Sequence, residues 1–265
     1  MNKEKVSVLM TVYNCEDVIP KSAKSILEQT YSNIEFIIVN DGSTDHTGDI
    51  LEKLASSDNR ILLINRHINM GRAYSLNEGL AAVKTKFLFI NDADDISNSR
   101  RIEKTMSFFE KNVRDQRNWG IIGTASRTVD VVNQTTSNYN ITFGSLGKQV
   151  IPTWRVYVGM PFIHSSFMYN TEYLRKIGGF SNEVSSLIDY FTLSKIANIA
   201  KIYGIDEILV ERYVTGNNYF MTEKVLEKRS GNIKIIREWQ KNNYRYNWIY
   251  KKINGVKKII KRKDI

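Results

Sequence analysis

The feature that most constrains the fold is a regular alternation of strand-like and helix-like segments over the first hundred residues. Four apolar, largely β-branched runs are separated by three amphipathic segments, in the order 6–12, 18–29, 34–39, 47–55, 61–64, 71–83 and 87–90. Strands and helices that alternate in this way form a parallel sheet with helices on both faces. Ligands of such sheets bind beyond the carboxyl ends of the strands, so we expect the polar residues after these runs to converge on one crevice.

The chain becomes less regular after about Asn118. Further strand-like and helix-like stretches are separated by a polar loop rich in Gly, Asn and Thr at 133–147. The strand-like stretches are 119–123, 125–132, 161–169 and 208–213, and the helix-like ones are 171–177 and 189–200. We therefore predict one α/β fold with a mostly parallel central sheet flanked by helices, followed by a basic helical tail.

The net charge of +10 is concentrated at one end of the chain. Residues 1–220 hold 24 Lys and Arg and 24 Asp and Glu. Residues 221–265 hold 14 Lys and Arg but only 4 Asp and Glu. A neutral body with a basic tail is typical of a docking or anchoring arm, and a nucleic-acid-binding surface would spread the charge more widely.

Cysteine and histidine usage narrows the chemistry. The single cysteine, Cys15, excludes an internal disulfide, and the three histidines show no metal-ligand spacing. No apolar stretch approaches the roughly 20 residues that cross a bilayer, and the N-terminal run lacks a cleavage site. The expectation is a soluble protein of a reducing compartment.

The sharpest chemical signal is Asp92-Ala93-Asp94, followed by Asp95, directly after the apolar run 87–90. Three carboxylates within four residues repel one another unless a positive charge lies between them. A divalent cation, Mn²⁺ or Mg²⁺, shared with a diphosphate fits this arrangement. A helix N-cap cluster is the plain structural alternative.

Two other strand ends carry polar groups that suit a nucleotide. Thr11, Val12, Tyr13 and Asn14 offer a hydroxyl, a stackable ring and an amide, and Asp41 could accept a hydrogen bond from a uracil or thymine ring N–H. An ordinary turn explains Asp41-Gly42-Ser43 equally well. Neither GxGxxG nor GxxxxGK[ST] occurs, so the phosphates would be held by metal and side chains.

Taken together, these segments resemble family 2 of the glycosyltransferases, which have the glycosyltransferase A fold. The matching segments are VSVLMTVYN (6–14), SILEQTYSNIEFIIVNDGSTD (25–45), NMGRAYSLNEGL (69–80) and FLFINDADD (87–95), with a weaker match through GGF (178–180), DYFTLSKIA (189–197) and ILVERYVTGN (208–217). The resemblance implies a catalytic domain over 1–220, with a nucleotide-sugar-binding half (1–117) and an acceptor-binding half (118–220), and a basic helical extension over 221–265.

The resemblance also implies roles for individual residues. Thr11, Tyr13 and Asp41 would contact the nucleoside, Asp92 the ribose or a metal-bound water, and Asp94 the metal. Arg72 would approach the donor. Asp189 aligns with the catalytic base, although the residue before it is Ile188 where the family usually has an acid, so Glu183 stays open as an alternative base.

The implied activity is inverting transfer of a sugar from a nucleotide diphosphate sugar, first of all a UDP-sugar, to a glycan or lipid-linked acceptor in bacterial polysaccharide biosynthesis. A binding module that kept the pocket but lost transfer is the first alternative. Nucleic-acid binding through the aromatic and basic residues of the tail is a weaker one, because the body is neutral. His164 beside Ser165 suggests a hydrolase, but no GxSxG motif is present and we expect a structural role.

The last residues, 245–265, carry apolar positions at the spacing of one helical stripe, with lysines around it. Such a segment can lie in the plane of an anionic membrane. We therefore expect a cytoplasmic protein held peripherally on the inner face of the cell membrane. Docking of the stripe on the protein body is the alternative.

Overall fold

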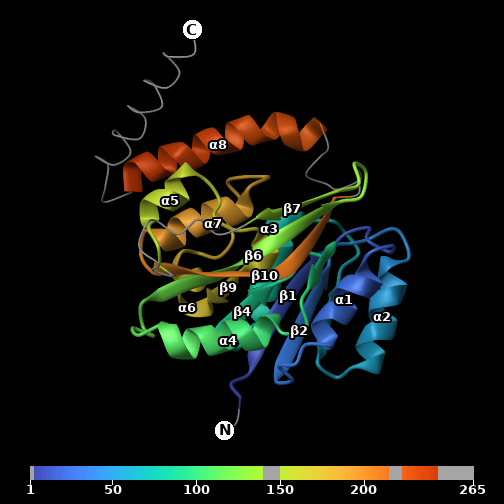
Figure 1. Cartoon of the computed structure of the whole chain (residues 1–265). Helices are drawn as coiled ribbons and strands as arrows, with labels where there is room; N and C mark the ends of the chain where they lie inside the picture. The colour runs from blue at the N-terminus through green and yellow to red at the C-terminus, as the bar shows by residue number, and fades with distance from the viewer. Residues whose placement is uncertain (1–2, 140–149, 215–222, 244–265) are drawn as a thin grey trace.

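The computed structural model describes residues 3–139, 150–214 and 223–243 (Figure 1). These form one ten-stranded sheet with helices on both faces. The strands are β1 (Val6–Val12), β2 (Ile34–Asn40), β3 (Ile61–Asn65), β4 (Phe87–Ile90), β5 (Asp95–Ser97), β6 (Trp119–Asp130), β7 (Thr135–Tyr139), β8 (Val150–Ile151), β9 (Met168–Asn170) and β10 (Lys201–Val214). The helices are α1 (Ile19–Leu27), α2 (Thr47–Ser57), α3 (Arg72–Ala82), α4 (Arg101–Asn112), α5 (Thr153–Val158), α6 (Thr171–Lys176), α7 (Ile188–Ala197) and α8 (Glu223–Asn243).

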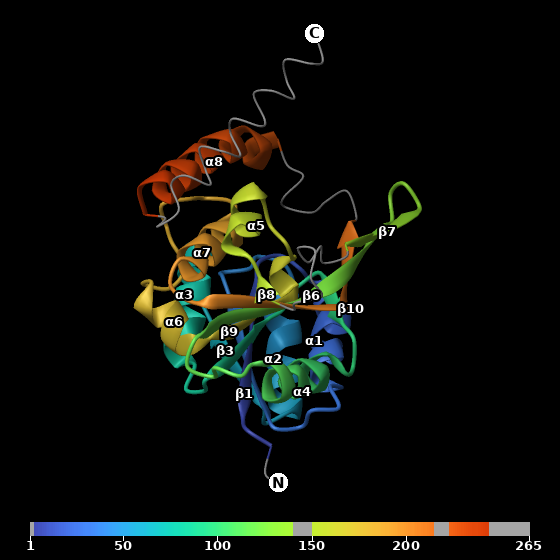
Figure 2. The same ribbon diagram turned by 60° about the vertical axis from the view of Figure 1, so that its left-hand side comes forward.

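The sheet is mixed, and six of its ten described strands run in one direction, as expected of a mostly parallel sheet. Its order is β3-β2-β1-β4-β9-β6-β10-β5, and the first four strands run parallel to one another. β9 is antiparallel to both of its neighbours, so β6 and β10 run in the direction of β1. The hairpin of β6 and β7 projects beyond the body of the molecule (Figure 2).

Side chains of β1 alternate between two cores, one on each face of the sheet. Val6, Val8 and Met10 pack with α1, α2 and α4, whereas Leu9 packs with α3, α6 and α7. This alternation follows from the strand period of two. Because both faces are covered, the strand reads in the sequence as a nearly continuous apolar run.

The segment 69–80 holds α3 tightly against the sheet and against the loop that precedes α7. A Cβ added at Gly79 would lie 2.2 Å from Leu9 Cδ1, so α3 approaches β1 closely and a larger residue there would force the Leu9 side chain to shift. Asn77 donates to the Phe180 carbonyl (2.7 Å) and accepts from the Phe180 N–H (2.8 Å). The segment therefore ties the first strands to the Gly-Gly-Phe turn.

The second half differs from the sequence prediction in several elements. The expected strand 161–169 is wrong over most of its length: His164–Ser166 form a 3-10 turn, and only β9 is extended. β6 is one continuous strand, β7 lies within the expected loop 133–147, and β10 begins earlier than predicted. Apolar runs interrupted by turns cannot be assigned from periodicity alone.

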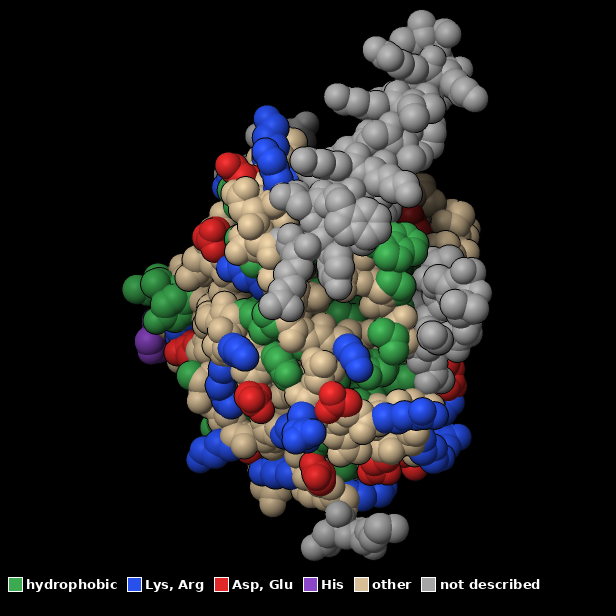
Figure 3. Space-filling view, turned by 90° about the vertical axis from the view of Figure 1, so that its left-hand side faces the viewer, with side chains coloured by type: hydrophobic (Ala, Val, Ile, Leu, Met, Phe, Trp, Pro, Cys, Tyr) green, Lys and Arg blue, Asp and Glu red, His purple; other side chains and the backbone are tan. Residues whose placement is uncertain are grey.

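The C-terminal helix α8 lies across α7 and α5 (Figures 1 and 2). Within the described residues, no helix is long and apolar enough to cross a membrane. The segment 245–265 lies outside the described residues. On the face shown in Figure 3, basic and acidic side chains are interspersed, which agrees with the charge balance of the body.

Candidate active site

The sheet brings the first strand ends together at one edge. In the parallel register Val12 lies beside Asn40, and Leu9 lies beside Ile90. The residues that follow these strands, Tyr13, Asp41 and Asn91, therefore emerge on the same edge. This is the edge of the sheet at which the alternating pattern predicted a crevice.

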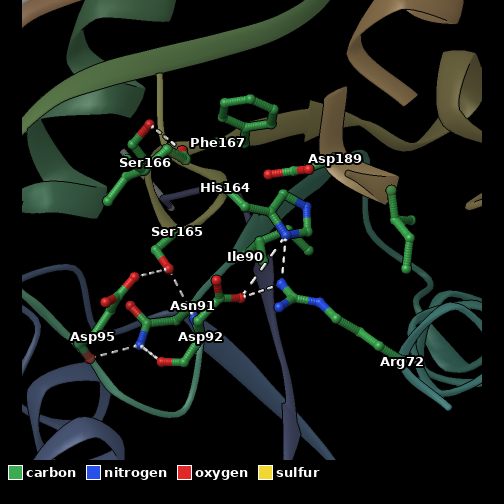
Figure 4. A network of polar contacts seen from close by, with 12 residues as sticks. Arg72, Ile90, Asn91, Asp92, Asp95, His164, Ser165, Ser166, Phe167 and Asp189 are labelled. Atoms are coloured by element: carbon green, nitrogen blue, oxygen red, sulfur yellow. Dashed lines mark hydrogen bonds and ion pairs between the residues drawn. The ribbon is translucent and has the colours of Figure 1, made fainter. Parts of the chain in front are cut away.

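Arg72 and Asp92 form an ion pair at the centre of this edge (Figure 4). Arg72 begins α3, and its Nη2 lies 2.6 Å from Asp92 Oδ1. The same Nη2 lies 2.9 Å from His164 Nδ1. Because a guanidinium only donates, His164 Nδ1 must accept and the ring proton must sit on Nε2. Histidine here is a neutral acceptor that shares Arg72 with Asp92.

Burial and charge set the protonation of these groups. Burial acts most strongly on Asp92 and raises its pKa, but the charge of Arg72, the neighbouring His164 and hydrogen bonds from Arg72 and Ser165 together outweigh it and hold this pKa below its ordinary value. Burial lowers the pKa of His164 to about 4, although Asp92 pulls it upward. At neutral pH the cluster therefore holds an Arg72–Asp92 pair and an uncharged imidazole.

A buried polar network supports the loop that carries Asp92 and Asp94. Arg101 is fully buried and donates to Ser97 Oγ (2.9 Å) and to the Ile90 carbonyl (2.9 Å). Asn91 donates to the carbonyls of Asp92 (3.0 Å) and Asp95 (3.1 Å). Each of these groups would cost free energy if buried without a partner, so the network fixes the backbone course of the loop.

Asp95 belongs to the buried polar network beneath this loop and faces away from solvent. It is 2% exposed and accepts a short hydrogen bond from Ser165 Oγ. Burial, together with the charges of Asp94 and Asp92, raises its pKa well above the ordinary value. The repulsion expected among three carboxylates is thus partly relieved: Arg72 pairs with Asp92, and burial makes Asp95 harder to ionise.

The structure offers oxygen ligands for a metal but no complete site. Among the described residues, no three His, Cys, Asp or Glu side chains gather around one point. Asp94 and Asp92 supply the hard carboxylate oxygens that Mg²⁺ and Mn²⁺ prefer. The residues therefore fit a cation that takes its remaining ligands from water and a diphosphate, as Mg²⁺ commonly does.

Asp41 closes the loop between β3 and α3. Its two oxygens accept from Met70 N (2.8 Å) and Gly71 N (2.9 Å), and Arg66 lies 3.2 Å away. Gly42 has φ +69°, and a Cβ there would lie 2.6 Å from the Ile68 carbonyl carbon. The turn after β2 thus packs on the loop backbone, and only glycine fits at this position.

The other predicted nucleoside residues differ in exposure. Tyr13 is 46% exposed and Thr11 half-buried, whereas the Val12 and Ala93 side chains lie in the core at 2% and 7% exposure. Asn14, with φ 50°, accepts from Thr44 N (2.8 Å) and links the first two strand ends. Because these two side chains are buried, Val12 and Ala93 can contact a ligand only through their backbone groups.

Asp189 lies in the first turn of α7 and faces His164 (Figure 4). Its Oδ1 accepts from Tyr190 N (2.8 Å), and its charge acts on the pKa of both Arg72 and His164. Glu183 lies elsewhere: its carboxylate is 60% exposed and accepts from Ser181 and Lys195. The structure brings Asp189, not Glu183, to the Arg72–Asp92 pair.

Sequence reasoning missed Arg101 altogether and gave His164 no part in the site. His164 comes to it through a contact with Arg72, far away along the chain, and Arg101 is held both by nearby Ser97 and Ile90 and by distant Phe167. The one local signal is polarity: His164-Ser165-Ser166 is a polar triplet inside an apolar stretch, and all three residues are buried.

Comparison with protein-family models shows to which family the chain belongs. Residues 7–178 match the model for glycosyl transferase family 2. The chain belongs to this family. The match includes Arg72, Asp92, Asp94 and His164 but ends before Asp189.

Individual relatives named as glycosyltransferases agree with this assignment. The putative glycosyltransferase EpsE of Bacillus subtilis is 34% identical over 181 residues, 66% of this chain and 60% of EpsE. The Escherichia coli protein UDP-Glc:alpha-D-GlcNAc-diphosphoundecaprenol beta-1,3-glucosyltransferase WfaP is 38% identical over 107 residues, 40% of this chain and 42% of WfaP. The chain thus spans less than two thirds of the length of these relatives.

Solved structures share the glycosyltransferase A fold predicted for this family 2 chain. TarS of S. aureus in complex with UDP-GlcNAc superposes with a TM-score of 0.69 at 19% identity, covering 90% of this chain and 67% of TarS. Mannosyltransferase PcManGT of Pyrobaculum calidifontis in complex with GDP-Man and Mn²⁺ superposes with a TM-score of 0.66 at 20% identity, covering 89% of this chain and 65% of PcManGT.

Proposed function

We propose that this family 2 chain transfers a sugar from a nucleotide diphosphate sugar, first of all a UDP-sugar, to a glycan or lipid-linked acceptor in bacterial polysaccharide biosynthesis. The observation that carries the proposal is the Arg72–Asp92 pair, 2.6 Å apart at the carboxyl edge of the sheet, with Asp189 facing it from α7. A cation and carboxylates so placed can bind a diphosphate, directly and through a metal.

The names of the relatives support the donor and acceptor classes. WfaP is named for a UDP-glucose donor and a diphosphoundecaprenol acceptor, and TarS was solved with UDP-GlcNAc. PcManGT was solved with GDP-Man, so the nucleotide itself needs a direct test.

A divalent cation, Mn²⁺ or Mg²⁺, would be held by Asp94, with Asp92 beside it. When bound, it offsets the charge of the leaving nucleoside diphosphate. Arg72 can donate to the same phosphates, since it begins α3 and its guanidinium points at Asp92 at the carboxyl edge of the sheet. Thr11, Tyr13, Asn14 and Asp41 would line the nucleoside end.

Asp189 would act as general base. It takes the proton of an acceptor hydroxyl, whose oxygen attacks the anomeric carbon while the bond to the diphosphate breaks on the opposite side. This displacement inverts the anomeric configuration. Glu183 is poorly placed for the role, because it is fixed to Ser181 and Lys195 at the surface.

Release of nucleoside diphosphate from a panel of UDP-, dTDP- and GDP-sugars separates an enzyme from a binding module. We expect slow release from one donor class even with water as acceptor. Tight binding of a donor without any release, with membrane extract added as a source of acceptor, would instead support the non-catalytic module.

We also propose that residues 1–117 serve the donor and 118–220 the acceptor, and that 245–265 holds the protein peripherally on the inner face of the cell membrane. Cosedimentation with vesicles of anionic lipid is expected for the full chain and not for a chain that ends at 244. Equal sedimentation of both would reject the anchoring role.

A further inference from the structure

The helix that carries Asp189 is fastened by a helix outside the family match. α8 follows the matched residues 7–178 by more than forty positions, and its buried face packs on α7. Asn232, Ile236 and Gln240 lie four residues apart along this face and are 7%, 0% and 0% exposed. Two of these three buried side chains are amides, whereas a helix that only covers a core would present apolar groups.

The two amides bind α7 and the segment directly before it, on either side of Asp189. Asn232 Nδ2 donates to Ser186 Oγ (2.7 Å), three residues before Asp189. Gln240 Nε2 donates to Ser194 Oγ (2.9 Å), five residues after it. Hydrogen bonds are directional, so two of them at separate points fix where α7 lies along its axis and how it is turned.

Tyr190, the neighbour of Asp189, joins the same contact. Its hydroxyl donates to the carbonyl of Val156 in α5 (2.9 Å) and lies 3.4 Å from Gln240 Nε2. Arg237 of α8 in turn donates to Gln240 Oε1 (2.9 Å). The amide of Gln240 is therefore held at both its nitrogen and its oxygen, and its position is well defined.

The first turn of α7 needs such support. It begins after Leu187, which has φ 61°, an unfavourable backbone angle for a side chain of this size. Such a conformation persists only where surrounding contacts enforce it. The contacts of Ser186 and Tyr190 enclose this residue and Asp189.

We propose that α8 positions Asp189: the Asn232 and Gln240 side chains hold α7 in the register that points the Asp189 carboxylate at the Arg72–Asp92 site. The inference rests on the proposed function, in which Asp189 is the base. Asn232 and Gln240 are positioning residues, since neither reaches the crevice. The donor-binding residues on β1, β2, β4 and α3 are not part of this contact.

The test compares Gln240→Met with Ile236→Val in the full chain. Gln240→Met keeps the side-chain length and removes the hydrogen bonds; Ile236→Val removes one methylene at the same depth on the same face. We expect Gln240→Met to lower kcat for nucleoside diphosphate release at least about tenfold, since small misplacements of reacting groups are costly. Its KM for donor should stay within about twofold of wild type. Ile236→Val should lower Tm and leave kcat unchanged.

A second amide variant, Asn232→Leu, and amide hydrogen exchange test the same contact independently. Asn232→Leu should reproduce the loss of kcat, and amide hydrogen exchange over 186–194 should quicken in both amide variants and not in Ile236→Val. Wild-type kcat in both amide variants, or equal losses in Ile236→Val, would overturn the inference. If the wild-type chain releases no nucleoside diphosphate, the proposed function fails, and the exchange data still show whether α8 holds α7.

Discussion

Asp189→Asn is expected to slow nucleoside diphosphate release by about 10²–10⁴-fold, the usual contribution of a general base. Asparagine keeps the size of the side chain and its acceptor for Tyr190 N, so α7 should be undisturbed. Donor affinity, measured by calorimetric titration, should stay within about twofold of wild type, since the nucleotide contacts lie on other elements.

Glu183→Gln is the matched control for this prediction. Its carboxylate is 60% exposed and paired with Lys195 at 3.2 Å, so its loss should leave the rate unchanged. A rate loss in Glu183→Gln with normal activity in Asp189→Asn would exchange the two roles and refute the present assignment.

Arg72→Met should weaken UDP binding about 10- to 100-fold, because hydrogen bonds to charged groups contribute about 1.5–3 kcal/mol. The change also removes the charge that holds the pKa of Asp92 below its ordinary value. Asp92 would then be largely buried without its ion-pair partner, which adds a loss of stability. Calorimetric titration and the thermal unfolding midpoint measure the two effects separately.

Arg60→Met separates a binding role from a general ion-pair effect. Arg60 pairs with Asp58 at 2.7 Å, with exposures of 27% and 22%, close to the 26% and 18% of Arg72 and Asp92. It should lower stability and leave UDP affinity unchanged. UDP affinity at the wild-type level in Arg72→Met would make the Arg72–Asp92 pair purely structural.

The sequence predicted the first half of the fold well because its information there is local. The strands β1, β2 and β4 are buried on both faces and the edge strand β3 is partly exposed, and each appears as an apolar run between amphipathic helices. Parallel strands then bring their carboxyl ends to one edge, which places Asp41, Asp92 and Arg72 together without any knowledge of long-range contacts.

The rest of the site depends on contacts between distant positions, which no local pattern encodes. His164 meets Arg72 across 92 positions, and Arg101 reaches the Phe167 carbonyl across 66. α8 meets α7 through Asn232 and Gln240, which read in the sequence as ordinary polar residues of a basic helix. A buried polar residue is recognised only once its partner is in place.

We propose above all that the carboxyl edge of the sheet at Asp92 and Asp94 binds a nucleoside diphosphate together with a metal. The most direct test is calorimetric titration of UDP, dTDP and GDP into the purified chain, first with Mn²⁺ and then with EDTA. We expect metal-dependent binding of one nucleotide, UDP first of all, and loss of that binding in Asp94→Ala. Absence of binding by all three nucleotides with Mn²⁺ present would contradict it.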